Sequence, residues 1–261
     1  MPSALHIARS GLEALDARLR TISNNLANAN TVGFKRDRAA FETLLYQTSR
    51  PAGAPQGADA RFGMGLSTGA GVRIAGNERV HTQGGFTVTD NALDLAIDGQ
   101  GLFEVTLPDG RAAYTRAGAF TSDAEGRIVT PQGYPLSPGL QIPQGATAIT
   151  IGADGTVSAQ LPGESAPTEV GQITLASFIN PAGLEPMGEN LFLESAGSGA
   201  PQQGVAGEAG FGRIRQGSLE SSNVSTVQEL VDMIETQRAY EINSKVISAA
   251  DEMMRYVNQA I

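Results

Sequence analysis

Apolar residues near the start of the chain recur at the spacing of a helix that packs against another helix. The intervals alternate between three and four residues, which places the apolar side chains at positions a and d of a heptad. The residues of this N-terminal stripe are Leu5, Ala8, Leu12, Leu15, Leu19, Ile22 and Leu26. The pattern predicts an amphipathic helix that ends near residues 30–33, where Asn30 and Gly33 favour a helix C-terminus.

The other end of the chain carries a second helical pattern, in two parts. Ser221, Ser222 and Asn223 precede it and are predicted N-cap residues. The two parts are out of register across residues 235–241, as in a coiled coil with a stutter. The residues of this C-terminal stripe are Val227, Val231 and Ile234, then Ile242, Val246, Ala249, Met253, Tyr256 and Ala260.

Neither helix is expected to be stable alone, because a single amphipathic helix in water leaves its apolar stripe uncovered. Residues 1–30 hold three basic and two acidic side chains, net +1, whereas residues 218–261 hold three basic and seven acidic ones, net −4. We therefore predict that the terminal helices pair with each other as a coiled coil, and also with copies of themselves. The alternative is that both helices pack on an ordinary globular core.

Between the helices, short strand-like runs alternate with turn signals. Asp98-Gly99, Asp109-Gly110, Glu125-Gly126 and Asp154-Gly155 each stand between two such runs. An acidic residue followed by glycine between strands is a hairpin signal. The predicted fold class is α+β, with N- and C-terminal helices paired as a coiled coil and an inserted antiparallel β domain.

The pattern divides the chain into three regions. Residues 1–33 and 222–261 form a terminal-helix coiled-coil domain, and residues 86–195 form a β-rich outer domain. Residues 34–85 and 196–221 form an extended connecting region, which includes the Pro/Gly-rich stretch 47–76. Within it, residues 35–46 fit either a short helix or a strand.

The sequence offers little for chemistry. It has no cysteine and two distant histidines, so no metal site is expected, and no nucleotide-binding glycine motif occurs. Residues 65–69 match the G-x-S-x-G nucleophile motif by letter, but both flanks are glycine-rich. Asn223-Val224-Ser225 matches a glycosylation sequon, for which helix capping is the better interpretation. We expect no catalytic residue, no metal and no cofactor.

Charge and hydropathy limit the partners and the location. The net charge of −9 argues against nucleic acid as a partner. No run approaches the ~20 apolar residues of a membrane-spanning helix, and direct lipid binding is not expected. The N-terminus lacks the basic and apolar regions of a secretory signal. The protein is expected to be cytoplasmic, or exported without a cleaved signal peptide.

Four parts of the sequence, in order, resemble the bacterial flagellar rod and hook family. They are residues 22–35, the paired segments 94–103 and 114–120, residues 217–224, and residues 237–241. Residues 41–47 and the Pro/Gly-rich stretch are most similar to the distal rod members of that family. The motif residues in the terminal regions are Asn24, Asn25, Leu26, Ala27, Asn28, Thr31, Gly33, Phe34, Lys35, Ser222, Asn223, Val224, Gln237, Arg238, Ala239, Tyr240 and Glu241.

The resemblance implies a structural role and no enzymatic activity. Proteins of this family pass through the flagellar type III export apparatus and polymerise into a helical tubular drive shaft, which spans the periplasm and transmits torque from the motor to the hook. The terminal helices would line the inner tube, the β domain would form the outer shell, and residues 47–76 would bridge subunits. The implied partners are copies of the chain, proximal rod proteins, the hook protein, the surrounding periplasmic and outer-membrane rings and the export apparatus. The alternatives are another axial protein of this family, of proximal rod or hook type, and a soluble helical-bundle interaction module.

Overall fold

The chain divides into two units, each made from segments that are distant in the sequence. The computed structural model describes residues 3–55, 61–163 and 166–259. The first unit, here called the helical unit, consists of residues 1–27, 37–78 and 225–261. The second, the β unit, consists of residues 28–36 and 79–224. The division into three regions that the sequence suggests stays a prediction.

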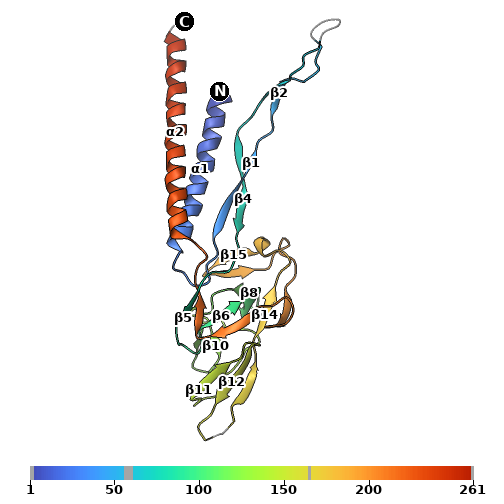
Figure 1. Ribbon diagram of the computed structural model, residues 1–261, viewed down its shortest axis with the longest axis vertical. Coiled ribbons are helices and arrows are strands. Elements are labelled where there is room, and N and C mark those ends of the chain that lie inside the picture. Colours follow the sequence, from blue (N-terminus) through green and yellow to red (C-terminus); the bar gives the residue numbers. More distant parts are fainter. Residues whose placement is uncertain (1–2, 56–60, 164–165, 260–261) are drawn as a thin grey trace. The chain divides into compact units, whose positions relative to one another are not determined.

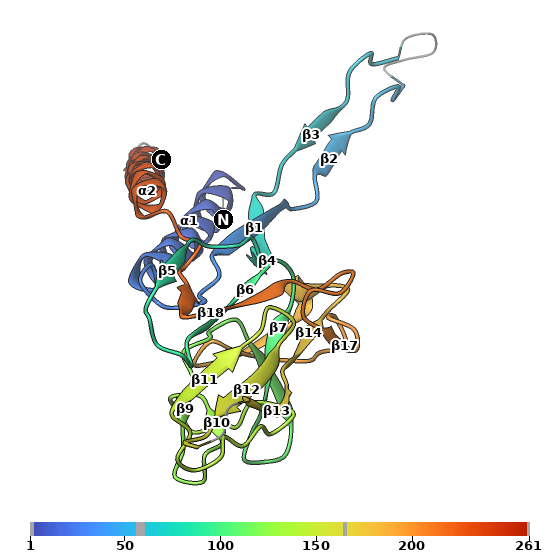
Figure 2. The same ribbon diagram turned by 60° about the horizontal axis from the view of Figure 1, so that its bottom comes forward.

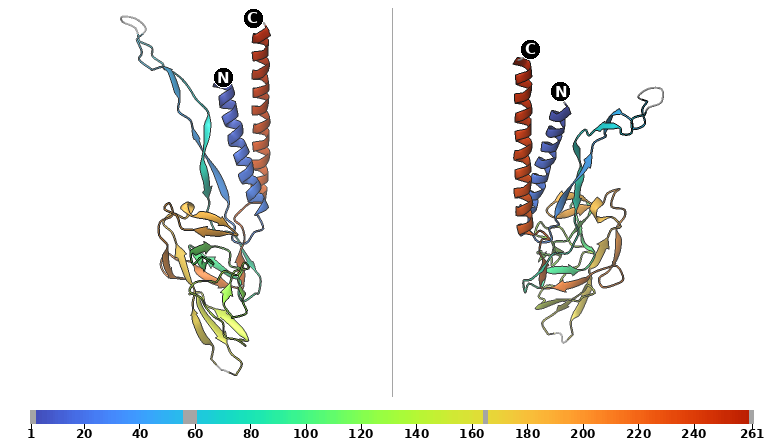
Figure 3. Two further views of the ribbon diagram at one scale, coloured as in Figure 1. Left: turned by 180° about the vertical axis from the view of Figure 1, so that it is seen from behind. Right: turned by 45° about the horizontal axis from the view of Figure 1, so that its top comes forward.

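Two antiparallel helices form the main part of the helical unit. Helix α1 spans Ser3–Ala27 and helix α2 spans Thr226–Gln259, and they run side by side with both chain ends at the same end of the pair (Figures 1 and 3). Val72 at the start of strand β4 donates its backbone N–H to Ser10 Oγ of α1, at 3.3 Å. This contact attaches the strands of the helical unit to α1.

The strands of the helical unit form two-stranded ribbons. Strand β1 (Asp37–Thr43) pairs with β4 (Val72–Arg79), and β2 (Gln47–Arg50) pairs with β3 (Leu66–Thr68), as Figure 2 shows. Exposed ion pairs cross between β1 and β4, from Arg38 to Glu78 at 2.6 Å and from Arg73 to Glu42 at 2.8 Å. Residues 37–43 therefore form a strand, which decides between the two structures that the sequence left open.

The β unit is built around an antiparallel sheet of six strands, in the order β15-β16-β8-β7-β14-β17. Smaller sheets pair β5 with β19, β6 with β18 and β9 with β10, and place β12 between β11 and β13. The strand bounds are β5 Phe86–Val88, β6 Leu95–Asp98, β7 Leu102–Thr106, β8 Ala112–Thr115, β9 Thr121–Ser122, β10 Ile128–Val129, β11 Ala148–Ile151, β12 Thr156–Gln160, β13 Thr168–Gln172, β14 Thr174–Ser177, β15 Glu185–Gly188, β16 Leu191–Leu193, β17 Gln202–Val205, β18 Arg213–Gln216 and β19 Ser218–Glu220; a short 3-10 helix spans Pro181–Gly183.

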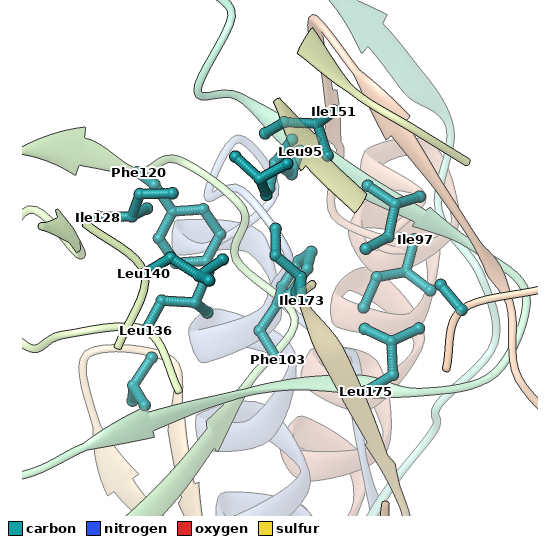
Figure 4. Packing of buried hydrophobic residues seen from close by; sticks show 14 of the residues in the cluster. Leu95, Ile97, Phe103, Phe120, Ile128, Leu136, Leu140, Ile151, Ile173 and Leu175 are labelled. Carbon is teal, nitrogen blue, oxygen red and sulfur yellow. The ribbon is translucent and has the colours of Figure 1, made fainter. Parts of the chain in front are cut away.

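Two hydrophobic clusters lie inside the β unit, and the larger one forms its main core. Leu95, Phe103, Phe120, Leu136 and Ile173 point toward one another, and each is almost completely buried (Figure 4). The rings of Phe103 and Phe120 meet edge to face, with 5.2 Å between their centroids. Burial of each such side chain contributes about 1.5–3 kcal/mol. This core, together with the terminal helices, confirms the α+β class with antiparallel strands.

The turn signals predicted three of the four hairpins correctly. Gly110, Gly126 and Gly155 have φ of 82°, 81° and 85°, and they lie in the turns β7–β8, β9–β10 and β11–β12. The hairpin predicted at Asp98-Gly99 is wrong, because β6 pairs with β18 and not with β7. Here the backbone carbonyls of the turn bind a buried side chain, as described below.

The predicted cap of the C-terminal helix is also wrong. Helix α2 begins at Thr226, and the hydroxyl of Ser225 accepts a long hydrogen bond of 3.5 Å from the backbone N–H of Gln228. Ser225 is therefore the N-cap residue. The side chain of Asn223, which the sequence suggested for this role, binds two other segments of the β unit, at Arg36 and at residues 80–82.

Candidate functional site: a buried ion cluster and an exposed helix stripe

Glu220, on β19, is the centre of a buried ion cluster. Its side chain is 0% exposed, and those of Lys35 and Arg116 are 3% and 5% exposed. Glu220 Oε1 accepts hydrogen bonds from Lys35 Nζ at 2.6 Å and from the backbone N–H of Gly84 at 2.9 Å. Glu220 Oε2 accepts a hydrogen bond from Arg116 Nε. The carboxylate therefore has a partner for each of its oxygens.

Arg116 also shapes the segment that follows β6. Its guanidinium donates to the backbone oxygens of Ile97 and Gly99, each at 2.7 Å, and to that of Gly101. Gly99 and Gly101 have φ of 120° and 133°, which side-chain-bearing residues rarely adopt. The glycines thus let three carbonyls converge on one arginine, and this explains why the segment is not a hairpin turn.

Burial and charge act in opposite directions on the cluster. Burial raises the pKa of Glu220, but Arg116, Lys35 and the Gly84 N–H together outweigh it and hold the pKa below its usual range. Burial lowers the pKa of Lys35, and the hydrogen bond to Glu220 offsets this only in part. Buried charges of this kind are tolerated only when they are paired and hydrogen-bonded.

The cluster brings three of the four sequence motifs together. Lys35 ends the first motif, Ile97–Gly101 and Arg116 belong to the two segments of the second, and Glu220 lies in the third. Sequence reasoning included Lys35 among the motif residues but missed Arg116 and Glu220 as a pair. The signal was an isolated charge inside each motif. No spacing rule joins residues that are 104 and 185 positions apart.

Asn223 connects three segments of the β unit, each of which adjoins the helical unit in the sequence. Its Oδ1 accepts the backbone N–H of Arg36 at 2.7 Å. Its Nδ2 donates to the backbone oxygens of Val80, at 2.8 Å, and Thr82, at 3.0 Å. The backbone N–H of Asn223 donates to the oxygen of Phe34, at 3.4 Å. One carboxamide therefore fixes the spacing of three chain segments.

We expect Asn223→Ala to loosen these segments without unfolding the β unit. The substitution leaves the backbone groups of Arg36, Val80 and Thr82 without a side-chain partner, at a cost of about 1–3 kcal/mol. Hydrogen exchange should show faster exchange of the Arg36 amide, with far-UV circular dichroism unchanged. Ser222→Ala is the matched control, because Ser222 Oγ accepts only a 3.3 Å bond from its near neighbour Val224. Unchanged exchange at Arg36 would contradict the prediction.

The remaining motif residues near the first helix also have defined places. Within the helical unit, buried Asn25 donates to the Asp37 backbone oxygen at 2.8 Å and to Glu229 Oε2 at 3.2 Å. Asn24 and Ala27 are exposed, and Leu26 is half-buried. In the β unit, Gly33 donates its N–H to the Glu220 backbone oxygen, at 2.8 Å. The other motif residues of this segment are half-buried Asn28 and Thr31, which hydrogen-bond each other, and buried Phe34.

The N-terminal stripe is partly covered in the single chain. Ala8 and Ile22 are buried, and the leucines at positions 5, 12, 15, 19 and 26 are half-buried. Two acidic side chains of α2 contact polar side chains of α1: Glu229 accepts a hydrogen bond from Asn25, and Asp232 lies 3.9 Å from Arg18. The contact between the helices therefore includes polar pairs as well as the apolar stripe.

The C-terminal stripe lies on exposed parts of α2. Ile242 is 62% exposed and Tyr256 is 76% exposed. Val227, Val231, Ile234, Val246, Ala249 and Met253 are exposed as well, whereas Ala260 lies outside the described residues. Of the motif residues, Gln237, Arg238, Tyr240 and Glu241 are exposed, and Ala239, Ser222 and Val224 are half-buried. A row of exposed apolar side chains along one helix indicates a surface that another polypeptide covers.

The structure around residues 65–69 does not fit the nucleophile motif that their sequence matches. Ser67 lies within β3 and pairs with Thr48 of β2, whereas a nucleophile elbow requires a turn between a strand and a helix. Among residues 3–55, 61–163 and 166–259, no three His, Asp or Glu side chains are grouped as metal ligands would be. Over the same residues, neither helix has the length and apolar character that crossing a bilayer requires.

Comparison with known families gives the class of protein. Residues 5–35 match the family described as flagella basal body rod protein. Residues 96–159 match the flagellar hook protein FlgE/F/G D1 domain, and residues 215–260 match the flagellar basal body rod FlgEFG protein C-terminal region. The three matches cover both terminal helices and part of the β unit. They define a protein of the flagellar rod and hook.

Relatives narrow the assignment. The flagellar basal-body rod protein FlgG of Buchnera aphidicola from Acyrthosiphon pisum is 47% identical over 99% of this chain and 100% of its own length. FlgG of Caulobacter vibrioides is 49% identical over 98% of each chain, whereas FlgF of the same organism is 35% identical over 98% of this chain and 96% of its own. The chain therefore belongs to the FlgG family of flagellar basal-body rod proteins. It is a structural subunit of the distal rod, which confirms the expectation from the sequence resemblance.

Proposed function

We propose that the terminal helices pair as a coiled coil, join those of neighbouring copies, and build the inner tube of a helical drive shaft. The observation that carries this proposal is the exposed apolar stripe of α2, represented by Ile242 and Tyr256. In water each of these side chains forgoes about 1.5–3 kcal/mol that burial would supply. Neighbouring subunits in a polymer would cover the stripe, and the helices would become fully ordered only there.

The three regions expected from the sequence have distinct roles in this proposal. Residues 1–33 and 222–261 line the tube, residues 86–195 form the outer shell, and residues 34–85 with 196–221 connect them. The stretch 47–76 bridges neighbouring subunits; its residues 56–60 lie outside the described structure. Support comes from the β2–β3 ribbon, which exposes Tyr46, Met64 and Leu66. Exposed apolar side chains on a two-stranded ribbon favour contact with another chain.

The proposed partners are further copies of the chain, proximal rod proteins, the hook protein and the rings that surround the shaft. The protein would reach its place through the flagellar export apparatus, without a cleaved signal peptide, and would span the periplasm. Its role is mechanical and it is not an enzyme. The family assignment supports this part of the proposal.

Light scattering on the purified chain tests the assembly. A helical polymer grows without limit above a threshold concentration, so scattering should rise steeply there, and electron microscopy should show tubes. A closed two-helix or four-helix bundle, as in an independent interaction module, would instead give one small oligomer at every concentration. That result would overturn the proposal.

We expect deletion of residues 47–68 to change the shaft more than the subunit. The deletion removes β2 and β3 but keeps β1 paired with β4, near the backbone bond from Leu44 N–H to the Gly71 oxygen, at 2.9 Å. Circular dichroism and thermal melting of the β unit should be unchanged. Electron microscopy should show rods that are more flexible or poorly joined to the hook. Loss of the β-unit melting transition would contradict this prediction.

A further inference from the structure

The β unit contains a cavity of about 250 Å³ beside the ion cluster. Its lining includes Lys35 and Arg116 of the cluster, together with His81 and Gln83. A volume of this size holds one amino-acid side chain, and it is below the usual range for drug-sized ligands. None of the functions described above uses this cavity.

The charged part of the lining has hydrogen-bonding capacity left over. Lys35 Nζ donates to Glu220 and to the backbone oxygen of Thr82, which leaves one of the three N–H groups of an ammonium without a partner among the described residues. Arg116 makes four hydrogen bonds, one fewer than its five N–H groups allow. With two cations and one carboxylate, the cluster carries a net positive charge next to the cavity. This arrangement attracts an anion.

His81 adds an acceptor to the same cavity. Its ring hydrogen-bonds the backbone of Pro181, while its Nε2 is buried and has no hydrogen-bond partner in the described structure. Burial, followed by the charges of Lys35 and Arg79, lowers the pKa of His81 to about 4, so the ring is neutral near pH 7. The unpaired Nε2 therefore presents a lone pair, and such a buried acceptor calls for an N–H or O–H donor.

Apart from Gln100, Ser177 and two glycines, the rest of the lining is apolar. Leu102, Ala176 and Phe178 are buried and form one part of the cavity wall. Ile179, next to them in the lining, is 82% exposed. Such a wall accommodates the methylene groups of a side chain that ends in a charge. The cavity thus combines an apolar wall, spare cationic donors and one unpaired acceptor.

We propose that this cavity receives an acidic side chain of a second copy of this chain, with its carboxylate on Lys35 and Arg116 and an N–H of the same segment on His81 Nε2. This rests on the proposed assembly into a polymer. The charge of the chain favours it, because 27 acidic residues and a net charge of −9 make carboxylates abundant on every neighbouring copy. A single charge-assisted contact is weak in free solution, but a polymer holds the neighbour at high effective concentration.

The cavity itself is tested on the monomeric full chain by NMR. The probes are N-acetyl-glutamate α-amide, its neutral counterpart N-acetyl-glutamine α-amide, and inorganic phosphate. We expect the glutamate probe to shift the signals of His81, Gln83 and Gly99–Gly101 with millimolar affinity, and the glutamine probe to bind at least tenfold more weakly. Equal binding of both amides, or no binding, would overturn recognition of a carboxylate. If phosphate binds with the same affinity as the glutamate probe, the cavity recognises a free anion, and the side-chain assignment is overturned.

The role of the neighbouring copy is tested by a pair of variants at Ser177, a half-buried residue of β14 that lines the cavity. Ser177→Asp supplies a carboxylate from within the chain and should exclude both the probe and the neighbour. We expect this variant to raise the threshold concentration for assembly at least tenfold, with Ser177→Asn close to wild type. If the probe binds and Ser177→Asp still assembles like Ser177→Asn, the second copy is the wrong occupant. If the wild-type chain does not polymerise at all, the proposed assembly fails, whatever the probes show.

Discussion

Replacing Glu220 with glutamine is expected to destabilise the β unit by about 3–5 kcal/mol, because the change leaves Lys35 and Arg116 buried without a counter-charge. The NH2 of the amide would also replace one of the two oxygens and face either Lys35 or Arg116 with a second donor. Urea unfolding of the whole chain, followed by far-UV circular dichroism, measures the effect. Glu208→Gln removes the same charge from an exposed position and is the matched control, with an expected change within about 0.5 kcal/mol.

The same carboxylate predicts how stability depends on pH. Because the pKa of Glu220 is lower in the folded chain than in the unfolded one, its contribution is fully present above the ordinary carboxyl pKa. That contribution is lost as the pH falls through the lowered pKa of the folded state. The Glu220→Gln variant should therefore lose less stability than wild type between neutral and acidic pH. If the free energy of unfolding falls by the same amount in both proteins between neutral and acidic pH, the proposed role of this cluster is contradicted.

Replacing Ile242 with aspartate is expected to stop polymerisation while the β unit stays folded. The loss of one buried isoleucine at each subunit contact costs about 1.5–3 kcal/mol, which raises the threshold concentration roughly 10- to 100-fold. Burial of an unpaired carboxylate adds to this cost. Light scattering and electron microscopy report assembly, and thermal melting reports the fold.

The matched control is Ser244→Asp, which adds the same charge to α2 at an exposed polar position outside the stripe. We expect this variant to assemble near the wild-type concentration. If both variants fail to assemble, added charge on α2 is responsible, and the stripe has no special role. If Ile242→Asp assembles normally, the stripe is not a subunit contact.

The sequence predicted the features that depend on local periodicity. The heptad pattern located both helices, and glycine after an acidic residue located three hairpins, because each signal is contained within a few neighbouring residues. It could not predict that β6 pairs with β18, because these strands are far apart in the sequence and Arg116 binds the backbone oxygens of Ile97, Gly99 and Gly101. The role of Asn223 was missed for a similar reason. Its partners lie more than 140 residues away, whereas the cap interpretation used only adjacent positions.

The candidate site also contains one part that was predicted from local sequence and one part that was not. The exposed stripe of α2 was found from sequence because its members share one helix, although the pattern gave no indication of whether α1 or another chain covers it. The cavity beside the ion cluster was not found, because His81, Lys35 and Arg116 come from three separate segments. Their common position is a property of the folded chain alone.

The position of Glu220 near the end of the sequence affects the order in which the chain can fold. Lys35 and Arg116 are both made early, and their counter-charge arrives only with β19. A nascent or threading chain that lacks its last strands would have to bury two cations with no anion, which is strongly unfavourable. Premature closure of the β unit is thereby discouraged until β19 has been made.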